Sequence, residues 1–394
     1  MVDRTFARGH NAARRVHGRG AQSIGNSGNN PQAICAGERP KDYVPLSARL
    51  GTDVKASRGL GSQPRARDAL RVAFDSRPAA DVRGVGRYSR CLLTALRETG
   101  GTGVEIIETH RPRRADVFHS PWMEGAILRS PCPMVVTLHD LSALKRASEH
   151  LRAGMRMRLR HLAVQRAVRV IVPTEAVAGD AVERVGVERE RIVVIPEAPD
   201  STMYTRPAEE ITAVRERFGL PELYLLWVGS LRHPDPRKHV AKLAATPREL
   251  PLVLVGPTRP WAHELPDVIL TGEVSDEELA AIYSGAHALV MASEDEGFGL
   301  PAVEALACGT PVAACEVPAL REVLGERAAF VERGDLQSLI EAAERTRRPA
   351  PAPPAWTWQD AARSTWHVYR DVVAQTEGSR PVAWSLTEPR AELE

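Results

Sequence analysis

Residues 288–304 of the chain, ALVMASEDEGFGLPAVE, decide the architecture that the sequence predicts. The apolar run 288–291 predicts a buried strand, and Pro301 near the start of an apolar segment predicts a helix over 300–307. Between them lie two glycines, which let backbone N–H groups approach a ligand closely. A helix start also presents unpaired N–H groups and the positive end of the helix dipole. This unit therefore predicts a binding site for an anion such as a diphosphate.

Two glutamates flank this unit at a spacing of eight residues. Glu296 comes before the glycines, at the mouth of the expected pocket, and Glu304 lies one turn inside the helix. We interpret Glu296 as a group near a sugar and Glu304 as a carboxylate that holds a pair of ribose hydroxyls. A plain glycine turn with incidental acids is the alternative, and the flanking strand, glycines and proline together favour a site.

Outward from this unit, strands alternate with helices in both directions, which is typical of parallel sheets in an α/β fold. Strands are expected at 70–75, 104–107, 117–119, 134–138, 168–172, 191–195, 224–228, 252–255, 268–270 and 311–314, and helices at 88–96, 144–169, 276–283, 319–323, 336–345 and 358–374. The prolines of 196–199 break the pattern. We expect Rossmann-like domains at 70–198 and 199–376.

The ends of the chain differ from this globular part. Residues 1–70 hold twelve Lys or Arg against five Asp or Glu, although the whole chain has a net charge of only +2. We interpret 1–69 as a disordered leader or the product of a start codon assigned too far upstream. The tail 377–394 is expected to be frayed.

Composition narrows the class of protein further. The chain has 394 residues, 43% hydrophobic and 26% charged, as in a soluble globular protein. Neither a membrane span nor a secretory signal is visible, and the small net charge does not indicate a nucleic-acid partner. The five cysteines form no C-x-x-C pair and are expected to be reduced. We expect a cytoplasmic location.

Two cations are candidates for the leaving phosphate. Arg237 and Lys238 follow the strand 224–228, which ends in Gly229 and Ser230. Adjacent cations near a strand end can neutralise a diphosphate. A surface Arg-Lys pair is the alternative, and the position after the glycine favours the site.

The expected first domain contributes fewer candidates. Gly84 and Gly86 form a G-x-G loop after the strand 70–75, where a tight turn is an equal alternative to a phosphate or acceptor contact. His139 follows the strand 134–138 at its carboxyl end, where open parallel sheets bind ligands. A structural histidine is the alternative.

These segments together resemble the retaining glycosyltransferases of family 4. The E-x7-E block, Glu296–Glu304, carries this resemblance. The whole match extends from about Arg71 to Asp371. The other matching stretches are 71–90 (RVAFDSRPAADVRGVGRYSR), 137–141 (TLHDL), 228–231 (VGSL), 236–238 (PRK), 272–279 (GEVSDEEL) and 305–312 (ALACGTPV).

The resemblance implies a GT-B fold, with two Rossmann-like domains on either side of a cleft and the donor held mainly by the second. Arg237 and Lys238 would pair with the donor diphosphate, Glu296 would contact the transferred sugar, and Glu304 the ribose. The remaining implied donor-binding residues are Gly84, Gly86, Gly229, Ser230, Gly297, Phe298, Gly299 and Leu300. His139 would lie by the sugar, where it stabilises charge at the anomeric carbon or positions the acceptor.

Three departures from the family pattern concern the same cleft. The segment between Ile107 and Ala115 is short, which makes the first domain compact and affects its acceptor pocket. Two extra residues precede Arg237, so that Arg232 is an alternative for its role. His239 stands where the family usually has Asn.

We therefore expect transfer of a hexose, with a mannosyl donor favoured, from a nucleotide diphosphate sugar to a hydroxyl acceptor with retention of configuration. No metal cluster is visible, so that no cofactor is expected to be obligatory. A donor-binding partner protein without strong catalysis and another GT-B enzyme, such as a nucleotide-sugar epimerase, are the alternatives.

The acceptor stays open between a polysaccharide or other glycan, a lipid-linked glycan and a small metabolite. The basic segment 144–169 predicts an amphipathic helix. It is interpreted as a solvated helix face, with docking on an anionic inner membrane face or a phosphorylated acceptor as the alternative.

Overall fold

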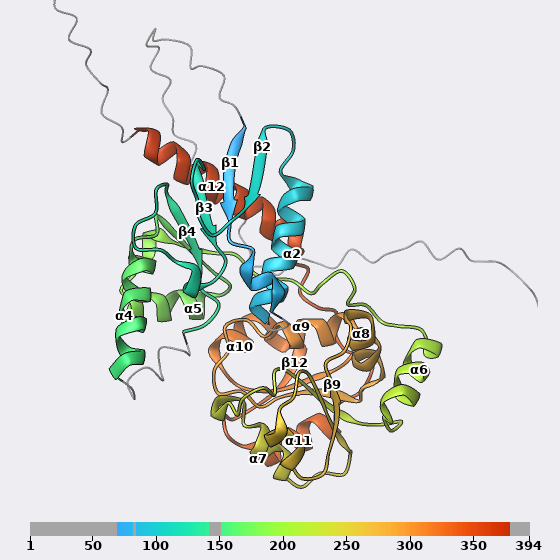
Figure 1. The fold of residues 1–394 in the computed structure, drawn as a ribbon. Helices are drawn as coiled ribbons and strands as arrows, with labels where there is room; N and C mark the ends of the chain where they lie inside the picture. The colour runs from blue at the N-terminus through green and yellow to red at the C-terminus, as the bar shows by residue number, and fades with distance from the viewer. Residues whose placement is uncertain (1–68, 82–83, 142–150, 379–394) are drawn as a thin grey trace, which may run out of the picture. The chain divides into compact units, whose positions relative to one another are not determined.

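The computed structural model describes residues 69–81, 84–141 and 151–378, which form two parallel β-sheets of six strands each (Figure 1). The expected α/β class is confirmed. We call residues 70–194 together with the last helix the first lobe, and residues 208–344 the second lobe. The expected leader lies outside the described residues except for its last position, and so does the tail beyond 378.

The strands of the first sheet lie in the order β2-β1-β3-β4-β5-β6. Their bounds are β1 (Leu70–Phe74), β2 (Val104–Glu108), β3 (Val117–Ser120), β4 (Met134–Thr137), β5 (Arg169–Val172) and β6 (Ile192–Val194). The main helices of this lobe are α2 (Gly84–Thr99), α4 (Leu151–Gln165), α5 (Glu175–Asp180) and α12 (Trp358–Gly378). Both faces of the sheet are covered, so that every residue of β3 and β4 is buried.

Successive side chains of β1 point to opposite faces of this sheet. Val72 and Phe74 belong to the core formed with α2 and α12, whereas Ala73 belongs to the core formed with α4 and α5. Residues 109–116 join β2 to β3 without a helix or strand, which accounts for the short segment noted in the sequence.

The second sheet has the strand order β12-β11-β10-β7-β8-β9, the arrangement of a dinucleotide-binding Rossmann sheet. Its strands are β7 (Leu225–Val228), β8 (Leu252–Val255), β9 (Val268–Gly272), β10 (Ala288–Met291), β11 (Val312–Cys315) and β12 (Ala328–Val331). Its helices are α6 (Ala208–Phe218), α7 (Val240–Ala245), α8 (Asp276–Gly285), α9 (Leu300–Ala307), α10 (Pro318–Leu324) and α11 (Leu336–Glu344). The predicted strands begin and end within two residues of the observed ones.

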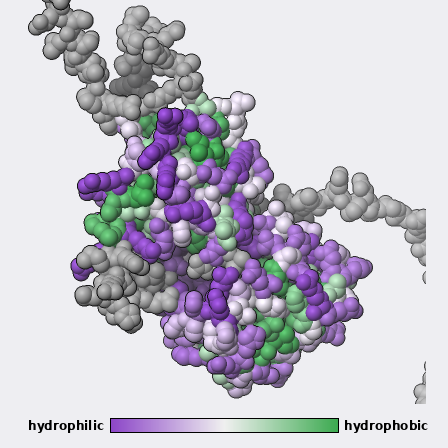
Figure 2. Space-filling model, in the orientation of Figure 1, coloured by the Kyte–Doolittle hydropathy of each residue, from purple (hydrophilic) through white to green (hydrophobic). Residues whose placement is uncertain are grey.

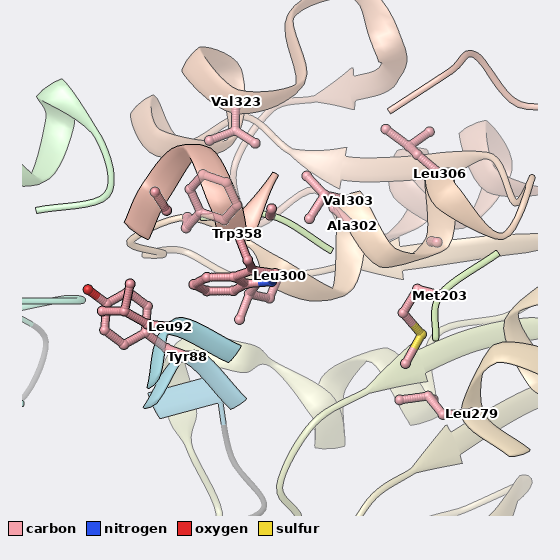
Figure 3. Packing of buried hydrophobic residues seen from close by; sticks show 14 of the residues in the cluster. Tyr88, Leu92, Met203, Leu279, Leu300, Ala302, Val303, Leu306, Val323 and Trp358 are labelled. Atoms are coloured by element: carbon pink, nitrogen blue, oxygen red, sulfur yellow. The ribbon is translucent and has the colours of Figure 1, made fainter. Parts of the chain in front are cut away.

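Helix α12 follows the second lobe in sequence but packs on the first lobe, beside α2 (Figure 1). The indole N–H of the buried Trp366 lies 3.3 Å from the Leu96 carbonyl oxygen and 3.2 Å from the Thr99 hydroxyl. At the start of the helix, Trp358 packs near Tyr88 and Leu300 (Figure 3), and its ring centroid is 5.6 Å from that of Tyr88. The apolar core is thus continuous from α2 to α9.

The predicted glycine loop at Gly84–Gly86 is wrong, because these residues form the first turn of α2. Glycine disfavours helix interiors, which is why the sequence pattern indicated a loop. Here close packing requires it: a Cβ atom on Gly86 would lie 1.7 Å from the Asp81 carbonyl oxygen.

The predicted basic helix 144–169 ends earlier in the structure, where α4 spans Leu151–Gln165; its predicted start at 144–150 lies outside the described residues. None of the helices in the described ranges has both the length and the apolar composition needed to cross a membrane.

Candidate active site

The candidate site lies where the strand order of each sheet reverses, at the carboxyl ends of the strands. Ligands bind open α/β sheets at such switch points. In the second lobe the reversal falls between β7 and β10, so that the loops starting at Gly229 and Ala292 meet there. In the first lobe it falls between β1 and β3, after Phe74 and Ser120.

A cavity of about 870 Å³ is lined by residues that follow these strand ends. Among its lining residues are almost all the residues predicted for the site: Gly84, His139, Gly229, Ser230, Arg237, Lys238, Glu296, Gly297, Phe298, Gly299, Leu300 and Glu304. Gly86 is the exception, since it packs against the backbone of Asp81. The motifs that are far apart in the sequence thus line one cavity.

The two glycines before α9 lie in a tightly packed loop, and their predicted approach to a ligand stays a prediction. Gly299 has a φ of +90°, which favours glycine. A Cβ atom on Gly297 would lie 1.7 Å from the carbonyl oxygen of His139 in the first lobe. The Thr174 hydroxyl of the first lobe donates a hydrogen bond of 3.0 Å to the Gly297 carbonyl. The loop before α9 is therefore a contact between the two lobes as well as a helix start.

Glu296 is oriented by two neighbours before any ligand binds. The Ser293 hydroxyl donates to its Oε1 at 2.7 Å, and Lys238 Nζ lies 3.7 Å from the same oxygen. The carboxylate side chain is 16% exposed, at the edge of the cavity. Its second oxygen can therefore accept a hydroxyl of a bound sugar.

Arg237 is held by acids that precede and face it. Asp235 accepts from its Nε at 3.1 Å and from its Nη2 at 2.7 Å, and Asp295 lies 3.9 Å from its Nη1. Burial alone would lower the pKa of Arg237, but the hydrogen bond and charge of Asp235 raise it. The guanidinium is a fixed positive charge in the wall of the cavity.

The next two residues, Lys238 and His239, also face acids. Lys238 faces Glu296, and the ring of His239 lies 2.6 Å from Glu294. His239 adopts a left-handed conformation with a φ of +49°, which Asn also tolerates well. The departure at this position thus keeps the backbone shape and adds a hydrogen bond to Glu294.

Glu304 is buried and faces a cation that the sequence analysis missed. Its side chain is 3% exposed, the Tyr283 hydroxyl donates to its Oε2 at 3.2 Å, and Arg87 Nε lies 3.2 Å from its Oε1. Arg87 also bonds to the Asp276 carboxylate. Burial raises the pKa of the Glu304 carboxyl to about 7, against the lowering effects of Arg87 and Tyr283.

Both ring nitrogens of His139 are already used. Nδ1 lies 3.0 Å from Glu197 Oε1, and Nε2 lies 2.9 Å from the Pro121 carbonyl oxygen. A carboxylate and a carbonyl only accept hydrogen bonds, so that this arrangement favours the doubly protonated ring. Burial alone would lower the pKa of His139, but Glu197 raises it. Glu197 thus favours the protonated form of His139, and the predicted contact of His139 with a sugar stays a prediction.

Further groups missed by the sequence analysis lie at the first-lobe switch point. The Trp122 indole donates to the buried Asp75 carboxylate at 3.0 Å, and Arg77 holds the same carboxylate with bonds of 2.7 and 2.8 Å. Burial would raise the pKa of Asp75, but these bonds lower it. Trp122 is therefore fixed in the first-lobe wall of the cavity, and its position directly after β3 was a signal in the sequence.

Comparison with known proteins finds a family model for each lobe of the chain. Residues 58–201 match the model described as Glycosyltransferase Family 4, and residues 222–347 match the model described as Glycosyl transferases group 1. The chain belongs to glycosyltransferase family 4. The predicted resemblance is confirmed.

Curated relatives of this family 4 chain include glycosyltransferases of two kinds. A D-inositol 3-phosphate glycosyltransferase of Xylanimonas cellulosilytica is 32% identical over 56% of this chain and 61% of that protein. A second, from Kineococcus radiotolerans, is 28% identical over 69% and 75%. The serotype-specific mannosyltransferase WbdA of Escherichia coli is 26% identical over 46% and 24%. The chain spans 54% to 61% of the length of the first relatives it matches.

Solved structures confirm the GT-B fold of the family 4 chain. Anabaena HepE, crystallised with UDP and glucose, has a TM-score of 0.54 at 18% identity and covers 79% of this chain and 100% of that one. The sucrose-phosphate synthase of Thermosynechococcus elongatus has a TM-score of 0.56 at 21% identity, with 79% and 98% covered. At these identities the likeness shows the fold alone.

Proposed function

We propose that the chain transfers a hexosyl group from a nucleotide diphosphate sugar to a hydroxyl acceptor, with retention of the anomeric configuration. The observation that supports this most is the convergence of Glu296, Lys238, Arg237 and Glu304 on one cavity at the start of α9. The relatives named mannosyltransferases and the complexes of HepE with UDP-glucose support a nucleotide-sugar donor, with a mannosyl group favoured.

The charges of the cavity suit the departure of a diphosphate. Lys238, Arg237 and the N–H groups before α9 offer positive charge where the leaving phosphate gains negative charge, which is the kind of stabilisation that speeds the reaction rather than only binding. Glu296 would orient the sugar hydroxyls, and Glu304 would accept from the ribose hydroxyls. The resemblance implies that the acceptor attacks on the face the phosphate leaves, and that the phosphate helps to take up its proton.

No obligatory cofactor is proposed. In the described ranges of the chain no cluster of three His, Cys, Asp or Glu side chains has a metal-binding arrangement. The lack of a metal requirement stays a prediction, and transfer in excess EDTA tests it directly.

The acceptor would bind against the first lobe. Trp122, Met123 and Glu124 line that wall of the cavity, and they follow β3 at the switch point. An indole beside a carboxylate can stack on a sugar ring and accept its hydroxyls. The curated relatives support either a small phosphorylated polyol or a growing glycan as the acceptor class.

A lipid-linked acceptor would bring the chain to a membrane, and α4 is the candidate contact. Arg158, Leu159 and Leu162 are exposed on it, the leucines to 45% and 49%. Figure 2 shows hydrophobic surface beside hydrophilic surface in the region of this helix. Apolar and basic side chains together favour an anionic lipid surface. The double variant Leu159→Ser, Leu162→Ser should co-sediment less with phosphatidylglycerol vesicles than the parent chain. Leu223→Ser, which changes an exposed leucine outside α4, is the control. Equal binding by the control and the double variant would support a solvated face of α4.

The proposed donor site predicts a specific thermal stabilisation. We expect one of GDP-, UDP-, ADP- and dTDP-sugars to raise the melting temperature of the chain, because a ligand that binds only the folded state stabilises it by about 2.7 kcal/mol at a hundredfold excess over Kd. Glu304→Ala should lose this ligand-dependent shift. Glu341→Ala, which removes a half-exposed carboxylate on α11, should keep it.

The same donor then tests transfer. Formation of an α-linked product from an α-linked donor, followed by NMR, would support retention. Stabilisation by a donor with no transfer to any acceptor class would favour a binding partner, and epimerisation of the donor without an acceptor would favour the epimerase alternative. If no nucleotide sugar of the panel raised the melting temperature of the chain, the transferase proposal would be overturned.

A further inference from the structure

Arg87 of α2 reaches from the first lobe to the donor half of the cavity. Its side chain is 11% exposed and lies against two acids of the second lobe, Glu304 on α9 and Asp276 at the start of α8. Arg87 Nε lies 3.2 Å from Glu304 Oε1. Both Arg87 and Glu304 line the cavity. A single cation of the first lobe thus contacts the carboxylate that we assign to the donor ribose.

The hydrogen bonding of this pair is incomplete. Glu304 Oε2 accepts from the Tyr283 hydroxyl, but Glu304 Oε1 has no hydrogen bond among the described residues, although Arg87 is within ion-pair distance. Arg87 Nη1 is also buried without a hydrogen-bond partner. Buried polar atoms are usually satisfied, so that an unsatisfied acceptor and donor side by side in a cavity point to a ligand with hydroxyl groups.

The alternative to a supporting role for Arg87 is competition. If the guanidinium occupied the place of the ribose, it would have to leave before a nucleotide could bind. The geometry favours support, because Arg87 uses Nε toward Glu304 and a second nitrogen toward Asp276, and leaves Oε1 able to accept a further bond. A carboxylate oxygen accepts two hydrogen bonds readily.

We propose that Arg87 is a positioning residue of the donor site, which holds the buried Glu304 carboxylate charged and in place to accept the ribose hydroxyls of the nucleotide. The inference rests on the proposed function and deepens it. Because Arg87 belongs to the first lobe and Glu304 to the second, the ribose acceptor is complete only while the lobes are in contact. Donor recognition is thereby coupled to closure of the site, which limits hydrolysis of the donor.

The charge on Glu304 depends on all the groups that face it. These are Arg87 and Cys91 on α2, Asp200 in the segment between the two lobes, Asp276 and Tyr283 on α8, and Cys308 at the end of α9. Arg87 is the cation of this set, and the two acids oppose ionisation of Glu304. With the pKa of Glu304 at about 7, its charge at neutral pH depends on that cation.

The test compares donor binding by the full chain, Arg87→Met, Arg87→Lys and Arg97→Met. Arg97 is the matched control, because it lies on the same helix and pairs with Glu108 on the surface, away from the cavity. At pH 7 we expect Arg87→Met to bind the stabilising nucleotide sugar about tenfold more weakly, because loss of the nearby cation leaves more of the Glu304 carboxyl protonated and no longer holds it in place. Arg87→Lys should recover part of the affinity, and Arg97→Met should bind like the parent chain.

The pH profile separates positioning from mere stability. The probe is a nucleotide sugar, whose phosphates are diesters and do not titrate near neutrality. Affinity of the parent chain should rise with pH through about 7, as Glu304 ionises. In Arg87→Met the rise should move to higher pH, because the nearest cation is gone, and in Glu304→Gln the rise should be absent.

Three results would overturn the inference about Arg87. Equal or tighter binding by Arg87→Met, with an unmoved pH profile, would overturn the inference and leave the donor site standing. An Arg87→Met chain that melts earlier but keeps the parent's pH profile would assign Arg87 a structural role and also overturn it. Failure of the parent chain to bind any nucleotide sugar would overturn both the proposed function and this inference.

Discussion

Lys238→Met is expected to lower the kcat of glycosyl transfer by a factor of about 10² to 10³, the usual cost of removing one group that stabilises charge developing in the transition state. The Lys238 ammonium lines the cavity and lies 3.7 Å from Glu296. We expect its main partner to be the departing diphosphate, whose charge grows as the bond to the sugar breaks. The measurement is the initial rate at saturating donor and acceptor.

Lys242→Met is the matched control for this prediction. Lys242 lies on α7, one turn further along the chain, and its side chain is exposed. Its removal should leave kcat unchanged. If Lys238→Met raised KM and left kcat as it was, Lys238 would bind the donor equally in the ground and transition states, and the role proposed for it in the departure of phosphate would be abandoned.

The elements whose sequences hold a strong local pattern were predicted well. The strand 288–291 and the helix 300–307 have the observed bounds, because a buried apolar run and a proline at the helix start are local signals. Helix α6 was missed because Val214 is its single fully buried residue, so that its apolar pattern is weak. The edge strand β12 was missed for a similar reason, since it is short and half-buried.

The error at Gly84–Gly86 has a different cause. Helix propensity is local, and it correctly disfavours two glycines in one helical turn. The deciding contact is the backbone of Asp81, which folds over Gly86 and excludes a side chain. A backbone contact of this kind leaves no periodic mark on the sequence, although the two residues are close together in the chain.

The residues of the candidate site likewise divide into those with a local sequence pattern, which were predicted, and those without one, which were not. Residues in the E-x7-E block line the cavity because helix and loop geometry fix their spacing. The long-range partners were not predictable: Arg87 with Glu304, His139 with Glu197, and Glu322 with the backbone N–H groups of 175 and 176. Each pair joins segments far apart in the chain, and a single sequence contains no signal for which acid meets which cation.

Gly297→Ala is expected to lower kcat/KM by about a hundredfold, because misplacement of reacting groups by about 1 Å has effects of this size. The added methyl group would lie 1.7 Å from the His139 carbonyl oxygen, a backbone atom of the other lobe that cannot move alone. The loop before α9 must therefore shift away from the first lobe. That shift would displace Glu296 and lengthen the bond from Thr174 to the Gly297 carbonyl.

Stability should change much less than activity in this variant. The clash lies between the lobes and outside the cores of the two sheets, so that the free energy of unfolding should fall by about 1–3 kcal/mol, as for other overpacked contacts. Gly179→Ala is the control, because a Cβ atom at this position in α5 would meet no atom within 4 Å. Steady-state kinetics and denaturant unfolding of both variants separate the two effects. If Gly297→Ala kept the parent's kcat/KM, the close approach of the lobes at this loop would not be needed for transfer. The proposed coupling of donor recognition to closure would then rest on the contact between Arg87 and Glu304 alone.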